Sequence, residues 1–403
     1  MEIGIDKIGF YTPHLYVDMN KLAVERNVEP EKFTIGIGQE KMAIAPLTQD
    51  PVTLAANAAL DILDEEDKEK IDFVLFGTES GIDQSKSAAV YVHRLLGLNP
   101  QARAVEVKQA CYGATAAIQM AKGHIALNPE SKVLVLGSDI ARYGLNTGGE
   151  ATQGAGAVAM VVSADPSIMV LEGPSAYLTA DVMDFWRPVY SDEAFVDGKF
   201  SNEQYIAFFS SAWEQYKSKT GQGLADFEAF SFHLPYTKMG KKALRAVLDE
   251  GTEEDSERLL ANHQIGAVYN RNVGNIYTAS LYLSLLSLLE QSEDLQDGSR
   301  IGLFSYGSGA VGELFAGRLQ PGYREHLNVA RHSELFATRK EVTVSEYEEI
   351  FQETLPTDGS SLDLDIDQDP AKICLSGIEG HSRQYVNKAS NIEAEKISAR
   401  AER

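Results

Sequence analysis

Two pairs of segments in this chain of 403 residues match when one member is shifted by 153 or 154 positions. IDFVLFGTES begins at Ile71 and aligns with ADFEAFSFHL, which begins at Ala225. In the same way GAGAV, from Gly154, aligns with GSGAV, from Gly307. Two separate matches at nearly one offset indicate an internal duplication, with chance similarity between short strands as the alternative. A duplicated chain folds into two halves of like topology.

Short apolar runs alternate with longer segments in which apolar residues recur at helical spacing. The runs Ile71–Gly77, Lys132–Gly137 and Ile301–Tyr306 are rich in Val, Phe, Ile and Leu, as buried strands are. Helical spacing extends over residues 84–96, 111–126, 202–219, 237–248 and 275–289. This alternation predicts an α/β fold.

The duplication divides the chain near residue 165. We expect a first α/β half over residues 1–165 and a second over residues 166–403. From about Thr343 the pattern gives way to acidic, Asp-rich sequence through Asp369 and then to a polar end. We expect this part to form a surface excursion and a helical or frayed terminus without a chemical role.

Charge and cysteine content exclude several classes of protein. Lys and Arg number 36 against 59 Asp and Glu, and a net charge of −23 is the wrong sign for neutralising nucleic-acid phosphates or anionic membranes. Cys111 and Cys374 form no CxxC pair, so neither a disulfide framework nor a metal site is indicated. The apolar stretch Ile276–Leu289 is too short to span a bilayer, and no leader pattern opens the chain. We expect a cytoplasmic protein.

Cys111 lies in QACYGATAA, where a strand-like run is followed by helical spacing. In the first turn of a helix a thiol faces unpaired N–H groups, and the positive end of the helix dipole favours the thiolate. The small neighbours Ala110, Gly113 and Ala114 leave room for a substrate beside the sulfur. The pattern predicts a nucleophile; the alternative is a buried, inert cysteine.

Glu79 and His233 occupy matching positions at the ends of the two repeated strands. A carboxylate at the end of a buried strand has a raised pKa and is a candidate general base, although a helix N-cap role is equally simple. If the halves are related by a twofold axis, the two strand ends meet, and we expect Glu79 and His233 to face one pocket. Pro235 is expected at the first position of the helix that follows.

Two further motifs surround these residues. A short helix after His233 carries a cluster of cations that suits an anionic ligand such as a phosphate, or simply faces solvent: Lys238, Lys241, Lys242 and Arg245. GSGAVG, from Gly307, fits GxGxxG, but a strand-like ELFAGRL follows where a dinucleotide site needs a helix. We expect N–H groups near Ser308 to form an oxyanion hole instead.

Together these segments resemble the family of 3-hydroxy-3-methylglutaryl-CoA synthases, in particular its shorter bacterial form. The resemblance covers nearly the whole chain and is carried in order by FGTES, QACYGATAA, SDIARYGLNTGGEATQGAGAVAM, DFWRP, VDGKFSNEQY, HLPYTKMGKKAL, NVGNIYTASLYL and GLFSYGSGAVGELF. It implies the thiolase fold, in which two α/β halves stack as five layers, and a homodimer. It also implies condensation of acetyl-CoA with acetoacetyl-CoA in the mevalonate pathway of isoprenoid synthesis, without a metal or other cofactor.

The resemblance assigns roles residue by residue. It implies that Cys111 carries the acetyl group, that Glu79 is the general acid/base and that His233 handles acetoacetyl-CoA. Asn275 and Ser308 match positions around the second substrate's carbonyl and the acyl-enzyme oxyanion. The remaining substrate-binding positions that it implies are Tyr143, Thr152, Asp184, Ser201, Lys238, Lys242 and, as a looser match, Glu29.

The chain departs from the family pattern at Gln109, where an acidic residue is frequent, and its C-terminal part is longer. Gln109 leaves open how far Cys111 is activated. Two alternatives also stay open. A decarboxylating ketoacyl synthase of the same fold would not need Glu79, because decarboxylation itself generates the enolate. A non-catalytic CoA-binding scaffold would not need Cys111, Glu79 and His233 together.

Overall fold

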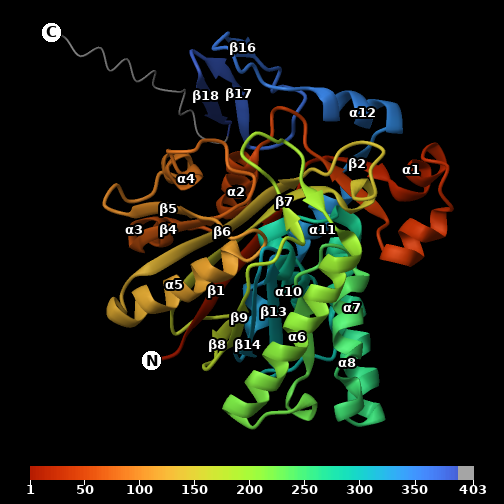
Figure 1. The fold of residues 1–403 in the computed structure, drawn as a ribbon. Coiled ribbons are helices and arrows are strands. Elements are labelled where there is room, and N and C mark those ends of the chain that lie inside the picture. Colours follow the sequence, from red (N-terminus) through yellow and green to blue (C-terminus); the bar gives the residue numbers. More distant parts are fainter. Residues whose placement is uncertain (389–403) are drawn as a thin grey trace.

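The computed structural model describes residues 1–388 and contains a central sheet of ten strands (Figure 1). Nine of the strands follow one another across the sheet, and β9 (Ala176–Thr179) pairs with β14 beside this path. The order is β12 (Ala229–Phe232), β13 (Arg300–Gly307), β14 (Val311–Leu319), β8 (Met169–Leu171), β1 (Ile3–Tyr11), β7 (Gly154–Ala164), β6 (Lys132–Ala141), β4 (Ile71–Gly77) and β5 (Arg103–Val107).

The strand order is mirrored about the contact between β1 and β8. On one side β4 is parallel to β6, while β6–β7 and β7–β1 are antiparallel; β12, β13, β14 and β8 repeat these pairings on the other side. The halves meet where Gly4 pairs with Val170 and Ile5 with Met169. A Cβ atom on Gly4 would lie 1.9 Å from the Met169 carbonyl oxygen, so this close approach requires glycine. The predicted duplication is confirmed.

Helices cover both faces of the first half of the sheet. A Cβ atom on Gly137 would lie 3.2 Å from the Ala114 side chain of α5 (Gly113–Leu127). The next residue, Ser138, points the other way and donates to the Pro51 carbonyl of α2 (Pro51–Leu60) at 2.8 Å. Because successive side chains of a strand alternate between faces, α2 and α5 lie on opposite sides.

The middle helices also contact the second half of the sheet. Thr115 of α5 donates to Ser305 of β13 at 2.8 Å, and its hydroxyl lies 2.7 Å from that of Tyr282 in α10 (Ser280–Gln291). α6 (Gly198–Thr220) covers the outer face of this half (Figure 1), and a Cβ atom on Gly312 of β14 would lie 3.0 Å from the Phe208 ring of this helix. The layers are therefore α2 with α4 (Ala88–Leu96), half a sheet, α5 with α10, half a sheet, and α6. The five-layer α/β fold is confirmed.

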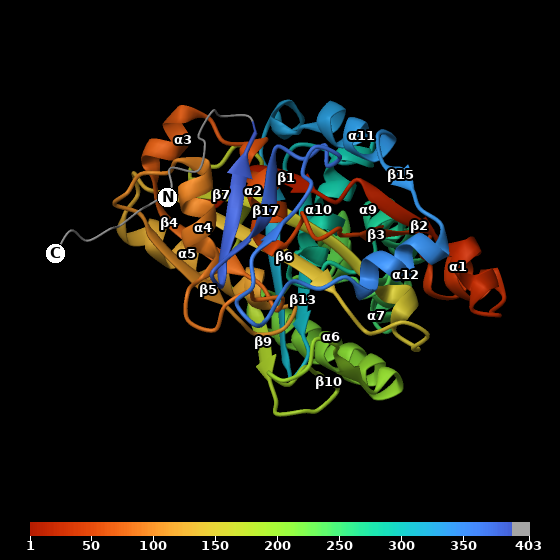
Figure 2. The ribbon, with the colours of Figure 1, turned by 90° about the horizontal axis from the view of Figure 1, so that it is seen from above.

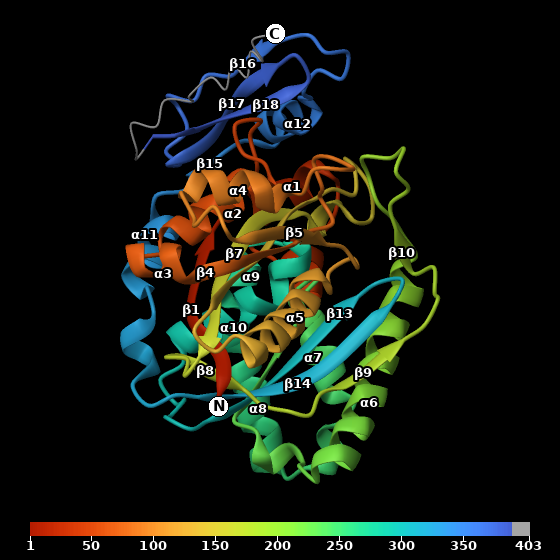
Figure 3. The same cartoon turned by 90° about the vertical axis from the view of Figure 1, so that its left-hand side faces the viewer.

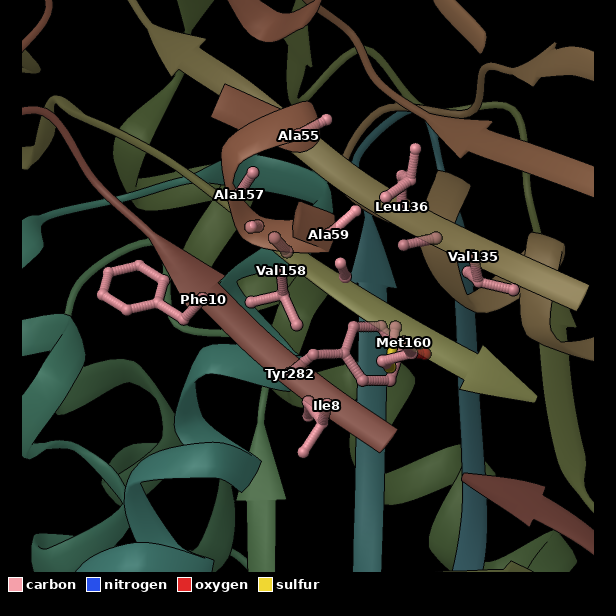
Figure 4. Packing of buried hydrophobic residues seen from close by; sticks show 14 of the residues in the cluster. Ile8, Phe10, Ala55, Ala59, Val135, Leu136, Ala157, Val158, Met160 and Tyr282 are labelled. Carbon is pink, nitrogen blue, oxygen red and sulfur yellow. The ribbon is translucent and has the colours of Figure 1, made fainter. Parts of the chain in front are cut away.

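Closely packed apolar side chains hold the first half together. Ile8 lies opposite Met160, and Phe10 opposite Val158, in the register of β1 and β7 (Figure 4). All four are at most 1% exposed. α2 covers the opposite face, where a Cβ atom on Gly9 of β1 would lie 3.1 Å from the Ala58 carbonyl oxygen, and alanines such as Ala55 let the helix backbone approach the sheet (Figure 4). Its start is fixed by a capping box of Asp50 and Thr53, with Pro51 in the first turn.

The region after Thr343 carries more structure than expected: residues 353–368 form the predicted surface excursion, without a buried residue, but ordered elements precede and follow them. It forms α12 (Val344–Gln352) and a sheet of β16 (Leu362–Asp363), β17 (Ile373–Glu379) and β18 (Ser382–Asn387), which lies over α2 and α4 (Figures 2 and 3). The apolar run ICLSGI after Lys372 is buried on this side, and the acidic residues before it hide that signal in the composition. The expected helical or frayed end lies largely in 389–403, outside the described residues.

The remaining elements surround the central layers. The helix expected over 237–248 is shorter, and Pro235 precedes it by a turn, because Thr237 is held by the carbonyls of Ile37 and Gly38. Within residues 1–388 no helix combines the length and apolarity needed to cross a membrane. The other elements are β2 (Leu15–Asp18), α1 (Met19–Glu25), the π-helical turn η1 (Lys32–Ile37), β3 (Lys41–Ile44), α3 (Glu65–Lys70), β10 (Phe185–Trp186), β11 (Phe195–Val196), α7 (Lys238–Arg245), α8 (Glu253–Gly266), α9 (Val268–Val273), α11 (Val329–Ala337), β15 (Lys340–Glu341), and the 3-10 turns η2 (Glu150–Thr152), η3 (Leu224–Asp226), η4 (Leu248–Glu250), η5 (Tyr277–Ala279) and η6 (Tyr323–His326).

Candidate active site

A cavity of about 710 Å³ opens between the two halves of the molecule. Its walls bring together residues that are far apart in the chain, from the loop before α5 to the turn after β13. Eight of the predicted site residues line it: Cys111, Tyr143, Thr152, Ser201, His233, Lys242, Asn275 and Ser308. The duplicated fold thus converges on one cavity.

Cys111 lies in a tight turn before α5. Ala110 has a left-handed φ of 42°, and the Tyr112 N–H donates to the Gln109 carbonyl at 3.0 Å. The Cys111 thiol donates to Oε1 of Glu79 at 3.1 Å. The expectation that a helix terminus lowers the pKa of this thiol is wrong: burial and the neighbouring Glu79 carboxylate raise it, and α5 begins only at Gly113.

Glu79 follows β4 and is surrounded by a buried polar network that sequence reasoning missed. Oδ1 of Asp139 accepts the N–H groups of Glu79 and Ser80 and the hydroxyls of Thr78 and Ser80, at 2.8 to 2.9 Å. Its Oδ2 accepts the N–H and hydroxyl of Thr278 at 3.0 and 2.6 Å. Burial and this second carboxylate raise the pKa of Glu79 to about 8. The sequence signal is an aspartate at the end of the apolar run KVLVLGSD.

The hairpin of β10 and β11 covers the site and was also missed. Phe185 pairs with Val196 in this hairpin and lines the cavity. Arg187, which follows β10, donates from Nη2 to the Glu79 carbonyl, and its positive charge opposes the rise in the pKa of that carboxyl. The Ala194 N–H donates to the Arg142 carbonyl at 3.1 Å, which ties the hairpin to the end of β6. Loop residues of this kind have no periodic pattern by which to be recognised.

His233 stands at the end of β12, on the cavity wall. Its N–H donates to the Phe304 carbonyl at 2.8 Å, and its carbonyl accepts the Tyr205 hydroxyl at 2.7 Å. Nδ1 is buried and hydrogen bonds to no group in residues 1–388. Burial lowers the pKa of His233 to about 3, so the imidazole is neutral at physiological pH.

Asn275 and Ser308 present polar groups on the same wall. Oδ1 of Asn275 accepts the Tyr277 N–H and the Ser280 hydroxyl, each at 2.9 Å. Its Nδ2 is buried and makes no hydrogen bond of good geometry in the described part of the chain, although its contact with the Tyr143 hydroxyl opposes the rise in the pKa of that phenol. The Ser308 carbonyl accepts a hydrogen bond from Nε2 of Gln109 at 3.3 Å. Gln109, where the chain departs from the family pattern, thus links the turn of Cys111 to the wall that carries Ser308.

Asp184 lies behind the wall rather than on it. Its Oδ2 accepts the hydroxyls of Ser201 at 3.0 Å and Tyr306 at 2.9 Å, and its Oδ1 accepts the Gly309 N–H at 2.9 Å. The carboxylate therefore fixes two residues that line the cavity. It also accepts a hydrogen bond from the Gly309 N–H, so this N–H group is not available for the oxyanion hole expected near Ser308.

Lys242 is the predicted cation at the rim. Its Nζ donates to the Tyr236 hydroxyl at 2.8 Å, and both residues line the cavity beside Ile37 of η1. Lys238 and Glu29 lie outside the cavity wall; Glu29 is exposed before η1. Among residues 1–388, no group of three or more His, Cys, Asp or Glu side chains is placed to hold a metal ion.

Comparison with known families decides where the chain belongs. Residues 1–167 match the model of the hydroxymethylglutaryl-coenzyme A synthase N-terminal domain, and residues 169–266 and 257–357 match that of the C-terminal domain. The chain belongs to the hydroxymethylglutaryl-CoA synthase family. It is therefore an enzyme of the acyl-transferring condensing class with the thiolase-like fold, as the resemblance in its sequence implied.

Members of the family cover nearly the whole chain. The hydroxymethylglutaryl-CoA synthase of Enterococcus faecalis is 54% identical over 390 residues, 96% of this chain and 100% of that protein. PksG of Bacillus subtilis, a polyketide-biosynthesis 3-hydroxy-3-methylglutaryl-ACP synthase, is 33% identical over 87% of this chain and 88% of its own. A crystal structure of an HMG-CoA synthase complexed with CoA superposes with a TM-score of 0.93 at 45% identity, covering 96% of this chain and 100% of that one. MvaS in complex with 3-hydroxy-3-methylglutaryl coenzyme A superposes with a TM-score of 0.85 at 34% identity, covering 96% and 99%.

Proposed function

We propose that this chain condenses acetyl-CoA with acetoacetyl-CoA and water to give 3-hydroxy-3-methylglutaryl-CoA and CoA, through an acetyl group carried on Cys111. The contact that carries the proposal is the 3.1 Å hydrogen bond from the Cys111 thiol to Glu79, beside a cavity that His233 and Asn275 also line. Relatives that are named as synthases of this product and solved with CoA or with the product support it. The mevalonate route is the pathway in which this reaction supplies isoprenoid synthesis.

In the first step the Cys111 sulfur attacks the carbonyl carbon of acetyl-CoA. The thiol proton passes to Glu79, which already accepts its hydrogen bond, and from there to the sulfur of the departing CoA. A carboxyl group with a pKa of about 8 suits this exchange, because it gains and loses a proton readily near neutral pH. The product is a thioester, whose methyl hydrogens remain acidic.

In the second step Glu79 removes a methyl proton from the acetyl group on Cys111. The resulting enolate attacks the ketone carbon of acetoacetyl-CoA, and a new carbon–carbon bond forms. The developing alkoxide takes a hydrogen bond from Nδ2 of Asn275 beside the neutral imidazole of His233, and it takes up the proton held by Glu79. Water then hydrolyses the thioester to Cys111. This sequence uses no metal or other cofactor.

The rim of the cavity is proposed to hold the CoA portion of the substrates. Lys242 and Lys238 of α7 supply positive charge for phosphate groups. Tyr143, Thr152, Ser201 and Ser308 are proposed to contact the acyl and pantetheine parts, with Asp184 and Glu29 as the remaining substrate-binding positions. We also propose that the chain works as a homodimer in the cytoplasm.

A labelled-substrate experiment tests the proposal. Wild-type enzyme given radiolabelled acetyl-CoA should retain about one acetyl group per chain, whereas Cys111→Ser should retain none while its circular-dichroism spectrum stays unchanged. With acetoacetyl-CoA added, wild type should release free CoA thiol and a product of the mass of 3-hydroxy-3-methylglutaryl-CoA. Label retained on Cys111→Ser would disprove the nucleophile. Turnover with malonyl-CoA in place of acetyl-CoA would assign the chain to decarboxylating ketoacyl synthases.

A further inference from the structure

Glu313 is a buried carboxylate that the proposed reaction does not use. It lies on β14 and is only 3% exposed. Its Oε2 accepts the hydroxyl of Tyr112 at 2.5 Å, and its Oε1 accepts Nε2 of Gln119 at 2.9 Å. Both donors belong to the segment that begins with the nucleophile turn and continues as α5, so this one side chain links that segment to the opposite half of the molecule.

Tyr112 directly follows Cys111 and is part of the turn that presents the sulfur. Its N–H closes the turn on the Gln109 carbonyl, and its own carbonyl accepts the Ala116 N–H at 3.0 Å in the first turn of α5. A Cβ atom on Gly307 would lie 2.6 Å from Cβ of Tyr112, so the turn packs directly against the end of β13. A shift of the Tyr112 side chain would therefore move the sulfur.

Two tethers join this turn to the hairpin of β13 and β14. Gln109 donates to the Ser308 carbonyl at 3.3 Å, and Tyr112 donates to Glu313 at 2.5 Å. The first is a bond between neutral groups at the cavity wall. The second is shorter, is partly buried and ends on a carboxylate, and such charge-assisted bonds are about twice as strong as neutral ones. The Tyr112–Glu313 bond is therefore the stronger of the two.

We infer that Glu313 is a positioning residue: through Tyr112 it holds the Cys111 sulfur in register with Ser308 and Asn275 on the opposite half. The inference rests on the proposed role of Cys111 as the acetyl carrier. Loss of the tether leaves the cavity and the rim cations in place, so it slows transfer of the acetyl group to sulfur more than it weakens binding of acetyl-CoA. A displacement of about 1 Å is enough to cost on the order of 100-fold in rate.

The test measures the rate of acetyl-enzyme formation in rapid-quench experiments with radiolabelled acetyl-CoA. Tyr112→Phe and Glu313→Ala should each lower the rate at saturating acetyl-CoA by about 10-fold or more, while the concentration for half-maximal rate changes less than about threefold. The double variant should be no slower than the slower single one, because both remove the same bond. Glu313→Gln keeps an oxygen that accepts from Tyr112 and should recover much of the rate.

Tyr282→Phe is the matched control. It also removes a tyrosine hydroxyl that bonds to α5, at Thr115, but within residues 1–388 this hydroxyl makes no hydrogen bond to residues 109–112 of the nucleophile turn. It should lower the melting temperature as Tyr112→Phe does and still acylate at the wild-type rate. The inference is overturned if Glu313→Ala acylates normally, or if Tyr282→Phe slows acylation equally. If Glu313→Ala does not fold, Tyr112→Phe and Glu313→Gln still decide. Failure of wild type to form acetyl-Cys111 would instead refute the proposed function itself.

Discussion

Glu79 has a pKa of about 8, close enough to neutral pH for the carboxyl group to gain and lose its proton. It is buried beside the Asp139 carboxylate, and both conditions disfavour its charged form, while Arg187 partly offsets them. Asp139 itself keeps hydrogen-bond donors on both oxygens, from Thr78, Glu79, Ser80 and Thr278. The network therefore fixes one carboxylate rigidly and leaves the other to exchange protons with Cys111.

This arrangement predicts a pH dependence that Glu79→Gln should remove. Because the folded-state pKa of about 8 lies above the usual 4.5, the native protein binds the extra proton between these values, and Glu79 makes unfolding easier as pH rises through that range. The effect should be on the order of 3 kcal/mol. Urea unfolding at pH 5 and pH 8.5 measures it. Glu79→Gln should lose less stability than wild type across this interval; an equal loss would contradict the assignment.

His233 contributes with the opposite sign. Its folded-state pKa of about 3 lies below the usual 6.5, so its contribution to stability falls as pH drops from 6.5 towards 3.

For activity, His233→Ala should still form the acetyl-enzyme but should condense poorly, with a rise of about 10-fold or more in the acetoacetyl-CoA concentration needed for half-maximal rate. Steady-state kinetics with each substrate varied in turn measures this. An unchanged response to acetoacetyl-CoA would remove His233 from the second step.

The chemistry-bearing residues were the predictable part of the site. Cys111 stands out through its small neighbours, and Glu79 and His233 through their matched places in the repeat. Asp139 and Arg187 were not predictable in this way, because their effect depends on which groups the fold brings within hydrogen-bond distance. Burial also depends on the whole fold and cannot be seen in a sequence pattern. The direction of the Cys111 pKa shift was therefore mispredicted, because the sequence indicates a helix terminus but not desolvation.

At the scale of elements, α2 is held from both sides. Its inner face packs on β7 and β6, and its outer side is bound by the C-terminal sheet through polar contacts. Asn57 donates to the Ile373 carbonyl at 2.8 Å and accepts the Ile373 N–H at 3.0 Å, as a neighbouring strand would. Asp50, which caps α2, also accepts the hydroxyl of Tyr385 at 2.6 Å and a guanidinium N–H of Arg383 at 3.0 Å.

The Asn57 contacts predict a large effect of Asn57→Ala. Asn57 is 3% exposed, and its loss leaves both polar groups of Ile373 buried without a partner, at a cost of about 2 to 4 kcal/mol in the free energy of unfolding. Asn128→Ala is the control, because Asn128 is exposed and bonds only locally to the His124 carbonyl; it should cost less than about 0.5 kcal/mol. Urea unfolding and proteolysis near residues 373–387 measure the difference. Similar losses in the two variants would show that the C-terminal sheet does not stabilise α2.

Element types were more predictable than their partners. The expected strand Ile71–Gly77 is β4 without change, and the run from Ile301 is β13 with one residue more at each end. The C-terminal sheet was missed because β17 and β18 obtain their stability from contact with α2 and not from their own composition. Long-range pairing of this kind leaves no periodic signal in either segment.

At the scale of the whole molecule, the central sheet ends at the edge strand β5. β5 pairs with β4 alone within residues 1–388, and Val105 in its centre is 42% exposed. Exposed sheet edges invite pairing with another chain. We propose that two copies meet at β5, which would join their sheets into one.

The proposed dimer predicts a mass of twice 44.1 kDa by light scattering for wild type. Val105→Lys places a charge on the edge and should give the 44.1 kDa monomer, because charged side chains oppose edge-to-edge pairing. Val329→Lys on α11 is the control: Val329 is 39% exposed and lies away from this edge, so the dimer should persist. A wild-type monomer, or a dimer that survives Val105→Lys, would contradict the proposed interface.

The central position of β1 has a consequence for the order in which the protein can be built. β1 is made before both of its neighbours in the sheet, β7, which begins at residue 154, and β8, which begins at residue 169. Its backbone N–H and carbonyl groups therefore have no partner strand until most of the first half has been synthesised. A newly made chain exposes an apolar strand throughout that interval, and translation speed up to β8 governs how long it is open to aggregation.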